Sequence, residues 1–232
     1  MQPRYCGRQC ALLAGDLTSS VLLSRLTTTF YPASFNQQRN ISDMNLRDKG
    51  GVTWMHYENQ SSLAASGFEF GRGLSYSTFE FTTDKPKLVA NTAELKRYHP
   101  QYYADRSSRN CPVQVFIKVK NTGPVASAVV VLGFVRSNHT DAPRNGELAG
   151  FARVHHLAPG DSTTVPIGIP PQVLSLVDEH GVESLRPGAY TLQFGVEGGS
   201  EGIPVTVQLQ LEGEQQVIFD MPAARSRDAA RL

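Results

Sequence analysis

The stretch Val113–Lys120 reads VQVFIKVK, and its apolar residues fall largely at every second position. A period of two is typical of a half-buried β-strand. Further short runs of strand-favouring residues follow, and turn signals such as Asn-Thr-Gly-Pro at 121–124 and Asn-Gly at 145–146 separate them. Many short strands with a turn every 8–12 residues or so are typical of an immunoglobulin-like β-sandwich. The pattern predicts strands at 113–119, 126–136, 148–157, 163–169, 173–177, 182–185, 190–194 and 205–211.

A second signal for this fold lies further along the chain, where Leu185–Tyr190 reads LRPGAY. This spelling is typical of a tyrosine corner, in which the tyrosine hydroxyl bonds back to nearby backbone. It predicts such a bond for Tyr190, and an ordinary buried aromatic ring is the alternative. The sandwich alone does not indicate a function, because this architecture serves many unrelated ones.

The residues before and after the predicted sandwich have a different character. Residues 33–66 are polar, Phe68–Phe81 is the densest aromatic stretch, and the charged connection at 84–110 is typical of a linker. We therefore expect four parts: an N-terminal segment at 1–82, a linker at 83–111, the sandwich at 112–213 and a flexible tail at 214–232.

The bulk composition excludes several classes of partner. A formal net charge of +1 gives no basic footprint for nucleic acid or for an anionic membrane. No stretch approaches the ~18 uncharged apolar residues of a membrane span. The three cysteines, Cys6, Cys10 and Cys111, are an odd number and define no closed disulfide framework. We interpret them as incidental thiols rather than zinc ligands.

Two features bear on the cellular compartment. The apolar run Ala11–Ala14 is too short for a signal peptide, so we expect the chain to be cytosolic or to lack its natural N-terminus. Three N-x-[ST] sequons, at Asn40, Asn59 and Asn138, are possible N-glycosylation sites and favour a secreted ancestor.

No group of side chains predicts a catalytic, cofactor or metal site. His155 and His156, neighbours on a predicted strand, should point to opposite faces and cannot easily share a metal. The Gly71-x-Gly73 pair is an incomplete phosphate loop, because Tyr76 stands where a third glycine belongs. The carboxylates of the N-terminal segment show no spacing that suggests acid–base work, and we interpret them as solvated groups: Asp43, Asp48, Glu58 and Glu69.

Trp54, His56 and Tyr57 lie in one short patch. Aromatic faces suit sugar rings, so this patch could form a platform on which a sugar stacks. Packing in the core is the favoured alternative.

Five short stretches resemble, in the same order, the signatures of family 3 glycoside hydrolases. Phe70–Phe79 (FGRGLSYSTF) is similar to the F-G-x-G-L-S-Y-T-x-F segment that closes the family's α/β sandwich domain, and Leu26–Pro32 (LTTTFYP) to its G-R-L-P-x-T-x-Y-P strand. Residues 121–123 (NTG), 147–154 (ELAGFARV) and 157–161 (LAPGD) are similar to the N-T-G, L-x-G-F-x-R-V and L-x-P-G-E stretches of its fibronectin type III-like domain.

The β-xylosidase branch of this family gives the better match. Ser42–Arg47 (SDMNLR) and Gly51–Tyr57 (GVTWMHY) are similar to its D-M-x-L-R and G-R-T-Y-R-F-Y segments, and the β-glucosidase branch, with a looser version, is the alternative. The chain departs from the family pattern at four positions, which indicates a divergent copy of the α/β junction: Ser24, Thr27, Val52 and Glu69.

The resemblance implies a mainly β fold, in which residues 1–82 are the C-terminal remnant of the α/β sandwich domain and precede the fibronectin type III-like sandwich. It also implies that the catalytic nucleophile belongs to a (β/α)8 barrel, which takes about 250 residues. A retaining enzyme needs two carboxylates about 5–5.5 Å apart. By the resemblance, neither lies in this chain. The expected partners are the barrel and the rest of the α/β domain, and possibly an oligosaccharide, and the parent enzyme is expected to be extracellular.

The alternative function is a free-standing immunoglobulin-like module for binding or adhesion. Such a module should not carry unpartnered aromatic residues, which would be an aggregation hazard. We expect this to apply to Phe68, Phe70, Tyr76 and Phe79. A compact unit in which residues 1–80 pack on the sandwich is compatible with either function.

Overall fold

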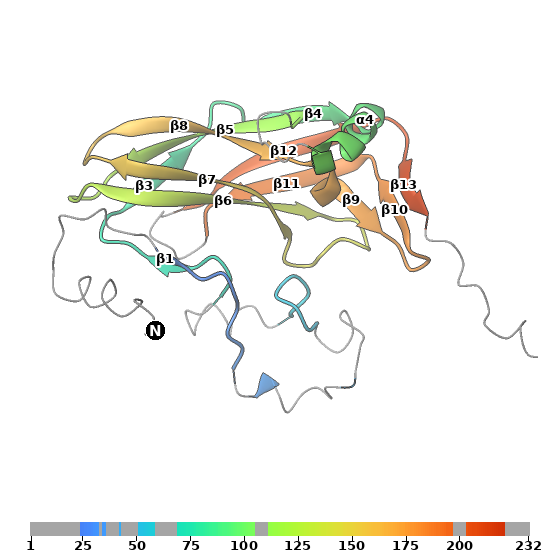
Figure 1. Cartoon of the computed structure of the whole chain (residues 1–232), viewed down its shortest axis with the longest axis horizontal. Coiled ribbons are helices and arrows are strands. Elements are labelled where there is room, and N and C mark those ends of the chain that lie inside the picture. Colours follow the sequence, from blue (N-terminus) through green and yellow to red (C-terminus); the bar gives the residue numbers. More distant parts are fainter. Residues whose placement is uncertain are drawn as a thin grey trace, which may run out of the picture.

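The computed structural model describes residues 24–32, 34–35, 42, 51–58, 69–104, 111–196 and 203–220, without the side chains of 99–104. Two sheets lie against each other (Figure 1). The larger has five strands in the order β4-β12-β11-β6-β7, and the smaller has the order β3-β5-β8. These strands are β3 (Phe79–Thr82), β4 (Lys87–Asn91), β5 (Val113–Asn121), β6 (Ser127–Ser137), β7 (Glu147–Leu157), β8 (Ser162–Ile169), β11 (Gly188–Phe194) and β12 (Val205–Glu212).

Two smaller sheets flank this sandwich. One has the order β13-β10-β9, from β9 (Ser175–Val177), β10 (Val182–Leu185) and β13 (Gln216–Asp220). The other pairs β1 (Ser24–Arg25) with β2 (Gly73–Leu74). None of the helices described is long and apolar enough to cross a membrane.

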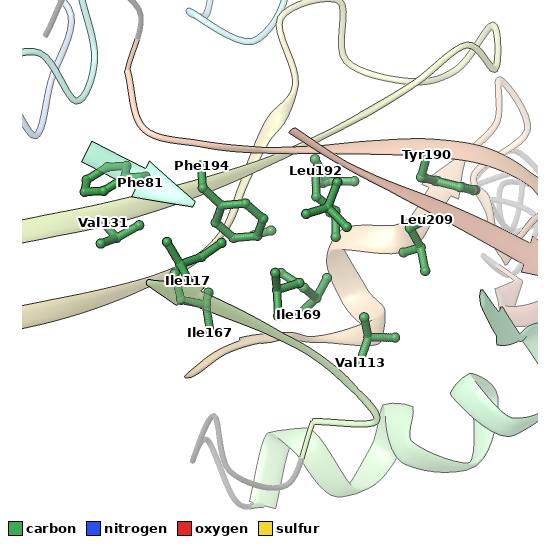
Figure 2. Close-up of a cluster of buried hydrophobic side chains, with 14 of the residues drawn as sticks. Phe81, Val113, Ile117, Val131, Ile167, Ile169, Tyr190, Leu192, Phe194 and Leu209 are labelled. Carbon is green, nitrogen blue, oxygen red and sulfur yellow. The ribbon is translucent and has the colours of Figure 1, made fainter. Parts of the chain in front are cut away.

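The core between the two main sheets follows from the alternation in the sequence. In β5 the odd-numbered residues, such as Ile117, are buried, whereas Phe116 and Lys118 are exposed. Figure 2 shows Phe194 and Leu192 of β11 facing Ile117 and Ile169 of the opposite sheet. The predicted sandwich is therefore confirmed. In place of the first part of the predicted strand at 173–177 there is a short 3-10 helix, η2 (Pro171–Leu174), and β9 follows it.

Residues 87–104, within the linker expected at 83–111, instead belong to the sandwich. They form β4, which pairs in parallel with β12, and helix α4 (Thr92–Ala104). Leu95 of α4 is 1% exposed and belongs to the core. The helix begins where Asn91 Oδ1 accepts a hydrogen bond from the Ala93 amide, 2.9 Å away, as expected of an N-cap. The Thr92 hydroxyl donates to the carbonyl of Glu214 across 2.7 Å. This bond fastens the start of the helix to the turn between β12 and β13.

The expected boundaries after residue 82 and before residue 214 also place paired strands in different parts of the chain. β3 lies before the boundary at 82, yet it pairs antiparallel with β5, and Phe79 and Phe81 are core residues. β13 lies within the expected tail at 214–232, yet it pairs antiparallel with β10. In both places the backbone groups find partners far away in the sequence, which local composition does not reveal.

Candidate functional site: the junction of the N-terminal segment with the sandwich

β6 is apolar on both of its faces. Val129 and Val131 point into the core, and Leu132 and Phe134 belong to a second cluster on the outer face of the five-stranded sheet. A strand that is buried on both sides needs a second layer. The N-terminal segment supplies it, and we call this contact the junction. Its apolar members are Trp54, Phe70, Val130, Leu132, Phe134, Leu148 and Val196.

Three aromatic rings form the centre of the junction. Trp54 stacks on Phe70 with ring centroids 5.0 Å apart and 14° between the planes. Phe134 meets both rings edge-on, at 5.6 and 6.2 Å. Gly71 follows with a φ of +79°, and a Cβ there would lie 2.8 Å from Leu132 Cδ1. The first glycine of the FGRGL stretch is therefore needed for both its backbone conformation and its close approach.

The proposed sugar platform is largely used for packing. One face of Trp54 is covered by Phe70. Tyr57 is 4% exposed and makes edge contacts with Tyr31 and Phe35, with centroids 5.1 and 5.7 Å away. The three candidate residues therefore do not present a common open face, and the core-packing alternative describes Trp54 and Tyr57.

Asn145 fastens the loop that carries Trp54 to the sandwich. Its side-chain amide donates to the carbonyls of Trp54 and Tyr57, over 2.6 and 2.8 Å. Its backbone amide donates to the Met55 carbonyl over 2.8 Å. Asn145 precedes Gly146, which has a φ of +85°, so the Asn-Gly turn between β6 and β7 places the amide at this loop. Sequence reasoning found the turn but not its partner.

The Asn121 side chain connects three of the signature stretches. It lies beside the turn at 121–124, at one end of the sandwich. It is fully buried, and its Oδ1 accepts from the Ser77 hydroxyl over 2.6 Å. Its Nδ2 donates to the carbonyls of Val125 and Leu157, both at 2.8 Å. Ser77 belongs to FGRGLSYSTF, Asn121 to NTG and Leu157 to LAPGD. These stretches are thus explained by one shared hydrogen-bond network.

The two carboxylates that the structure describes, Glu58 and Glu69, each pair with an arginine. Glu58 makes an exposed ion pair with Arg144, at 2.6 Å. Glu69 lies 3.6 Å from Arg72. Asp43 and Asp48 fall outside the described residues.

The two histidines of β7 are both exposed, contrary to the expectation of opposite faces. The register shifts there: Val129 pairs with Val154 and Ser127 with Leu157, so β7 carries an extra residue, which is a β-bulge. Across the described ranges, no group of three or more His, Cys, Asp or Glu side chains is placed to hold a metal ion.

Two ionisable groups near the junction are shifted by burial. Burial lowers the pKa of Arg25 to about 10, and its Nη1 donates to the Gly71 carbonyl over 3.0 Å. Burial also raises the pKa of the Glu147 carboxyl at the start of β7. Arg25 fixes the backbone of the FGRGL stretch and so has a structural role.

The aromatic residues expected to lack partners are mostly packed. Phe79 is 2% exposed in the core and Phe70 lies in the junction, so that expectation was wrong for both. Tyr76 is 55% exposed, and Phe68 falls outside the described residues. Of the sequons, Asn138 is exposed just after β6, and Asn40 and Asn59 fall outside the described residues.

The chain is similar to known proteins over most of its length. Residues 129–197 match the model of the fibronectin type III-like domain. The exo-1,4-beta-xylosidase xlnD of Emericella nidulans is 30% identical over 210 residues, which cover 88% of this chain and 25% of that protein. The chain is homologous to the C-terminal region of family 3 glycoside hydrolases. The xylosidase of Aspergillus oryzae is 31% identical over 210 residues, with 86% and 25% covered.

Solved structures of family 3 glycoside hydrolases agree. A family 3 exo-beta-xylosidase, XlnD, in complex with a xylobiose aziridine probe superposes with a TM-score of 0.73 at 29% identity, covering 90% of this chain and 27% of that one. The beta-glucosidase of Kluyveromyces marxianus gives a TM-score of 0.51 at 26% identity, with 72% and 17% covered. The chain thus spans about a quarter of the length of the curated family 3 relatives it matches.

Proposed function

We propose that this chain is the C-terminal accessory part of a family 3 exo-β-xylosidase and that it has no glycosidase activity by itself. The observation that carries the proposal is the 30% identity across 88% of the chain to a region that forms 25% of a xylosidase. In support, the Glu58 carboxylate forms an exposed ion pair with Arg144, and the Glu69 carboxylate pairs with Arg72 three residues later.

The accessory role is to hold the N-terminal segment in place. Asn121 and Asn145 tie residues 51–58 and 70–79 to the sandwich, and Trp54 and Phe70 pack on Phe134. By the resemblance, the α/β domain to which these segments belong contributes the acid/base loop of the intact enzyme. A displacement of about 1 Å at a catalytic group costs up to ~100-fold in rate, so a rigid support for that domain serves catalysis indirectly.

The β-xylosidase branch is favoured over the β-glucosidase branch. The TM-score is 0.73 with the xylosidase and 0.51 with the K. marxianus glucosidase. The GVTWMHY stretch, which is similar to a segment of the β-xylosidase branch, also supports this assignment. In this structure it is the loop that the Asn145 side chain holds. The proposed substrate of the whole enzyme is therefore a terminal β-xylosyl unit.

The test is hydrolysis of p-nitrophenyl β-xyloside and β-glucoside by the purified chain, with the E. nidulans xylosidase as positive control. We expect no release of p-nitrophenol above the buffer rate. Turnover that co-purifies with the chain and is lost in Glu58→Gln or Glu69→Gln would contradict the non-catalytic assignment.

We also propose that the parent enzyme is secreted, because Asn138 is exposed in its sequon on the loop after β6. Expression through a yeast secretory pathway should add a glycan there. A glycosidase-sensitive mass shift that disappears in Asn138→Gln supports this proposal. Secreted chain whose Asn138 peptide carries no glycan contradicts it.

A further inference from the structure

Several residues of the five signature stretches are exposed in this chain, and two of them lie on one face of β7. In the stretch ELAGFARV, Gly150 approaches the Gly168 carbonyl so closely that a Cβ would lie 2.7 Å from it, and Val154 is in the core. Phe151, by contrast, is 67% exposed, and Arg153 is exposed as well. An exposed aromatic side chain becomes informative where it extends an apolar surface, because contiguous apolar patches mark interaction sites.

Phe151 continues the junction onto the next strand. It lies directly opposite Leu132 in the antiparallel pair of β6 and β7, so both side chains are on the same face. Leu132 is 8% exposed because the N-terminal segment covers it. The covered surface therefore ends at β6, and the same apolar face goes on, uncovered by the described residues, at Phe151.

Arg153 gives this surface a charge. It lies opposite Val130, and the Val130 carbonyl accepts a hydrogen bond from Arg25 Nη2 over 3.4 Å. Arg25 and Arg153 thus both neighbour Val130. No described carboxylate forms an ion pair with Arg153. A surface that covers Phe151 should present apolar side chains and at least one carboxylate for Arg153.

We propose that Phe151 and Arg153 form a docking surface for the part of a family 3 enzyme that lies outside these 232 residues. The inference rests on the proposed function. The chain spans a quarter of the relative's length, and the assigned partner is the rest of such a protein. Continuity with the junction supports this partner, since the segment that covers Leu132 resembles the end of the α/β domain. The partner surface is apolar and carries a carboxylate.

The experiment uses a chimera in which the full chain replaces the matching C-terminal quarter of the E. nidulans xylosidase. Phe151→Ser and Arg153→Glu are compared with a matched control, Phe116→Ser. Phe116 is 49% exposed on β5, in the other sheet, so it tests the loss of an exposed phenylalanine away from the proposed surface. Melting temperature and xyloside hydrolysis are measured for each chimera, and melting temperature also for each isolated chain.

If the surface docks, Phe151→Ser and Arg153→Glu lower the melting temperature of the chimera by about 3 °C or more. The same changes leave the isolated chain within about 1 °C of the wild type, and Phe116→Ser changes neither. An active chimera in which Phe151→Ser behaves like Phe116→Ser overturns the inference and leaves the proposed function standing. An inactive, unfolded wild-type chimera overturns both. Self-association of the isolated chain that Phe151→Ser abolishes would assign the surface to a second copy instead.

Discussion

The hydroxyl of Tyr190 donates a hydrogen bond to the backbone carbonyl of Arg186, 3.0 Å away. Tyr190 is 1% exposed, so the bond is made inside the core at the point where β10 leads into β11. Arg186 in turn holds Asp141 through a guanidinium–carboxylate contact of 2.5 Å. The predicted tyrosine corner is confirmed, and it connects the β11 strand to the loop after β6.

Removal of the Tyr190 hydroxyl should destabilise the fold by about 1 kcal/mol, because the Arg186 carbonyl then loses a buried hydrogen bond. Urea unfolding of Tyr190→Phe measures this change in the free energy of unfolding. Tyr76→Phe is the matched control, because Tyr76 is 55% exposed, and it should unfold like the wild type. Equal midpoints for all three proteins would contradict a stabilising corner.

Tyr190 should also make the fold sensitive to alkali. Burial raises its pKa to about 12, whereas a tyrosine in an unfolded chain has a pKa of about 10. Between these values the unfolded chain releases the proton and the folded chain retains it, so stability falls as pH rises. The urea midpoint should therefore drop more steeply from about pH 9.5 to 11.5 in the wild type than in Tyr190→Phe. Parallel pH profiles would refute this.

The Asn121 network should be the most sensitive polar site among the signature residues. Asn121→Ala leaves the Ser77 hydroxyl and the carbonyls of Val125 and Leu157 without their bonds. We expect a loss of about 2–4 kcal/mol in the free energy of unfolding, because each buried group left unsatisfied is costly. Asn138→Ala, at an exposed position, should stay within about 0.5 kcal/mol of the wild type. Similar losses in both variants would argue against the network.

The Asn145 contact can be followed by fluorescence, because Trp54 is the single tryptophan. Asn145→Ala removes the amide that holds the carbonyls of Trp54 and Tyr57. Trp54 emission should shift to the red and acrylamide should quench it more strongly. Arg144→Ala breaks only an exposed ion pair with Glu58, worth at most about 1 kcal/mol, and should leave the spectrum unchanged. An unchanged spectrum in Asn145→Ala would show that the rings alone hold the loop.

Local pattern was enough to predict the sandwich and its tyrosine corner. The period of two in β5 and the LRPGAY spelling depend on neighbouring residues, which the sequence displays directly. β4 and α4 were missed because β4 is largely exposed and its only strand partner, β12, is distant in the chain. The Asn91-x-x-Glu94 spacing was a usable helix-start signal, since Asn91 caps α4.

The junction was harder to predict because its contacts are all long-range. The residue types of Asn121 and Asn145 indicated turns, and both lie at turns. Apart from Val125, the partners named above for Asn121 and Asn145 come from segments 36–91 residues away, and no local rule selects them. Likewise, the bulge near His155 and His156 is visible only in the pairing of β7 with β6, which the sequence of β7 alone does not display.

The parallel pairing of β4 with β12 has a consequence for how the chain folds during synthesis. The hydroxyl of Thr92, the residue after β4, lies 3.2 Å from the Glu212 carbonyl, 120 residues later. At the ribosome, β4 therefore emerges long before its partner exists, and its sheet edge stays open until nearly the whole sandwich has been translated. Pairings of such long range are slow and expose strand edges to other chains. We therefore expect the yield of this protein in a cell to depend on protection of the nascent chain as well as on the stability of the final fold.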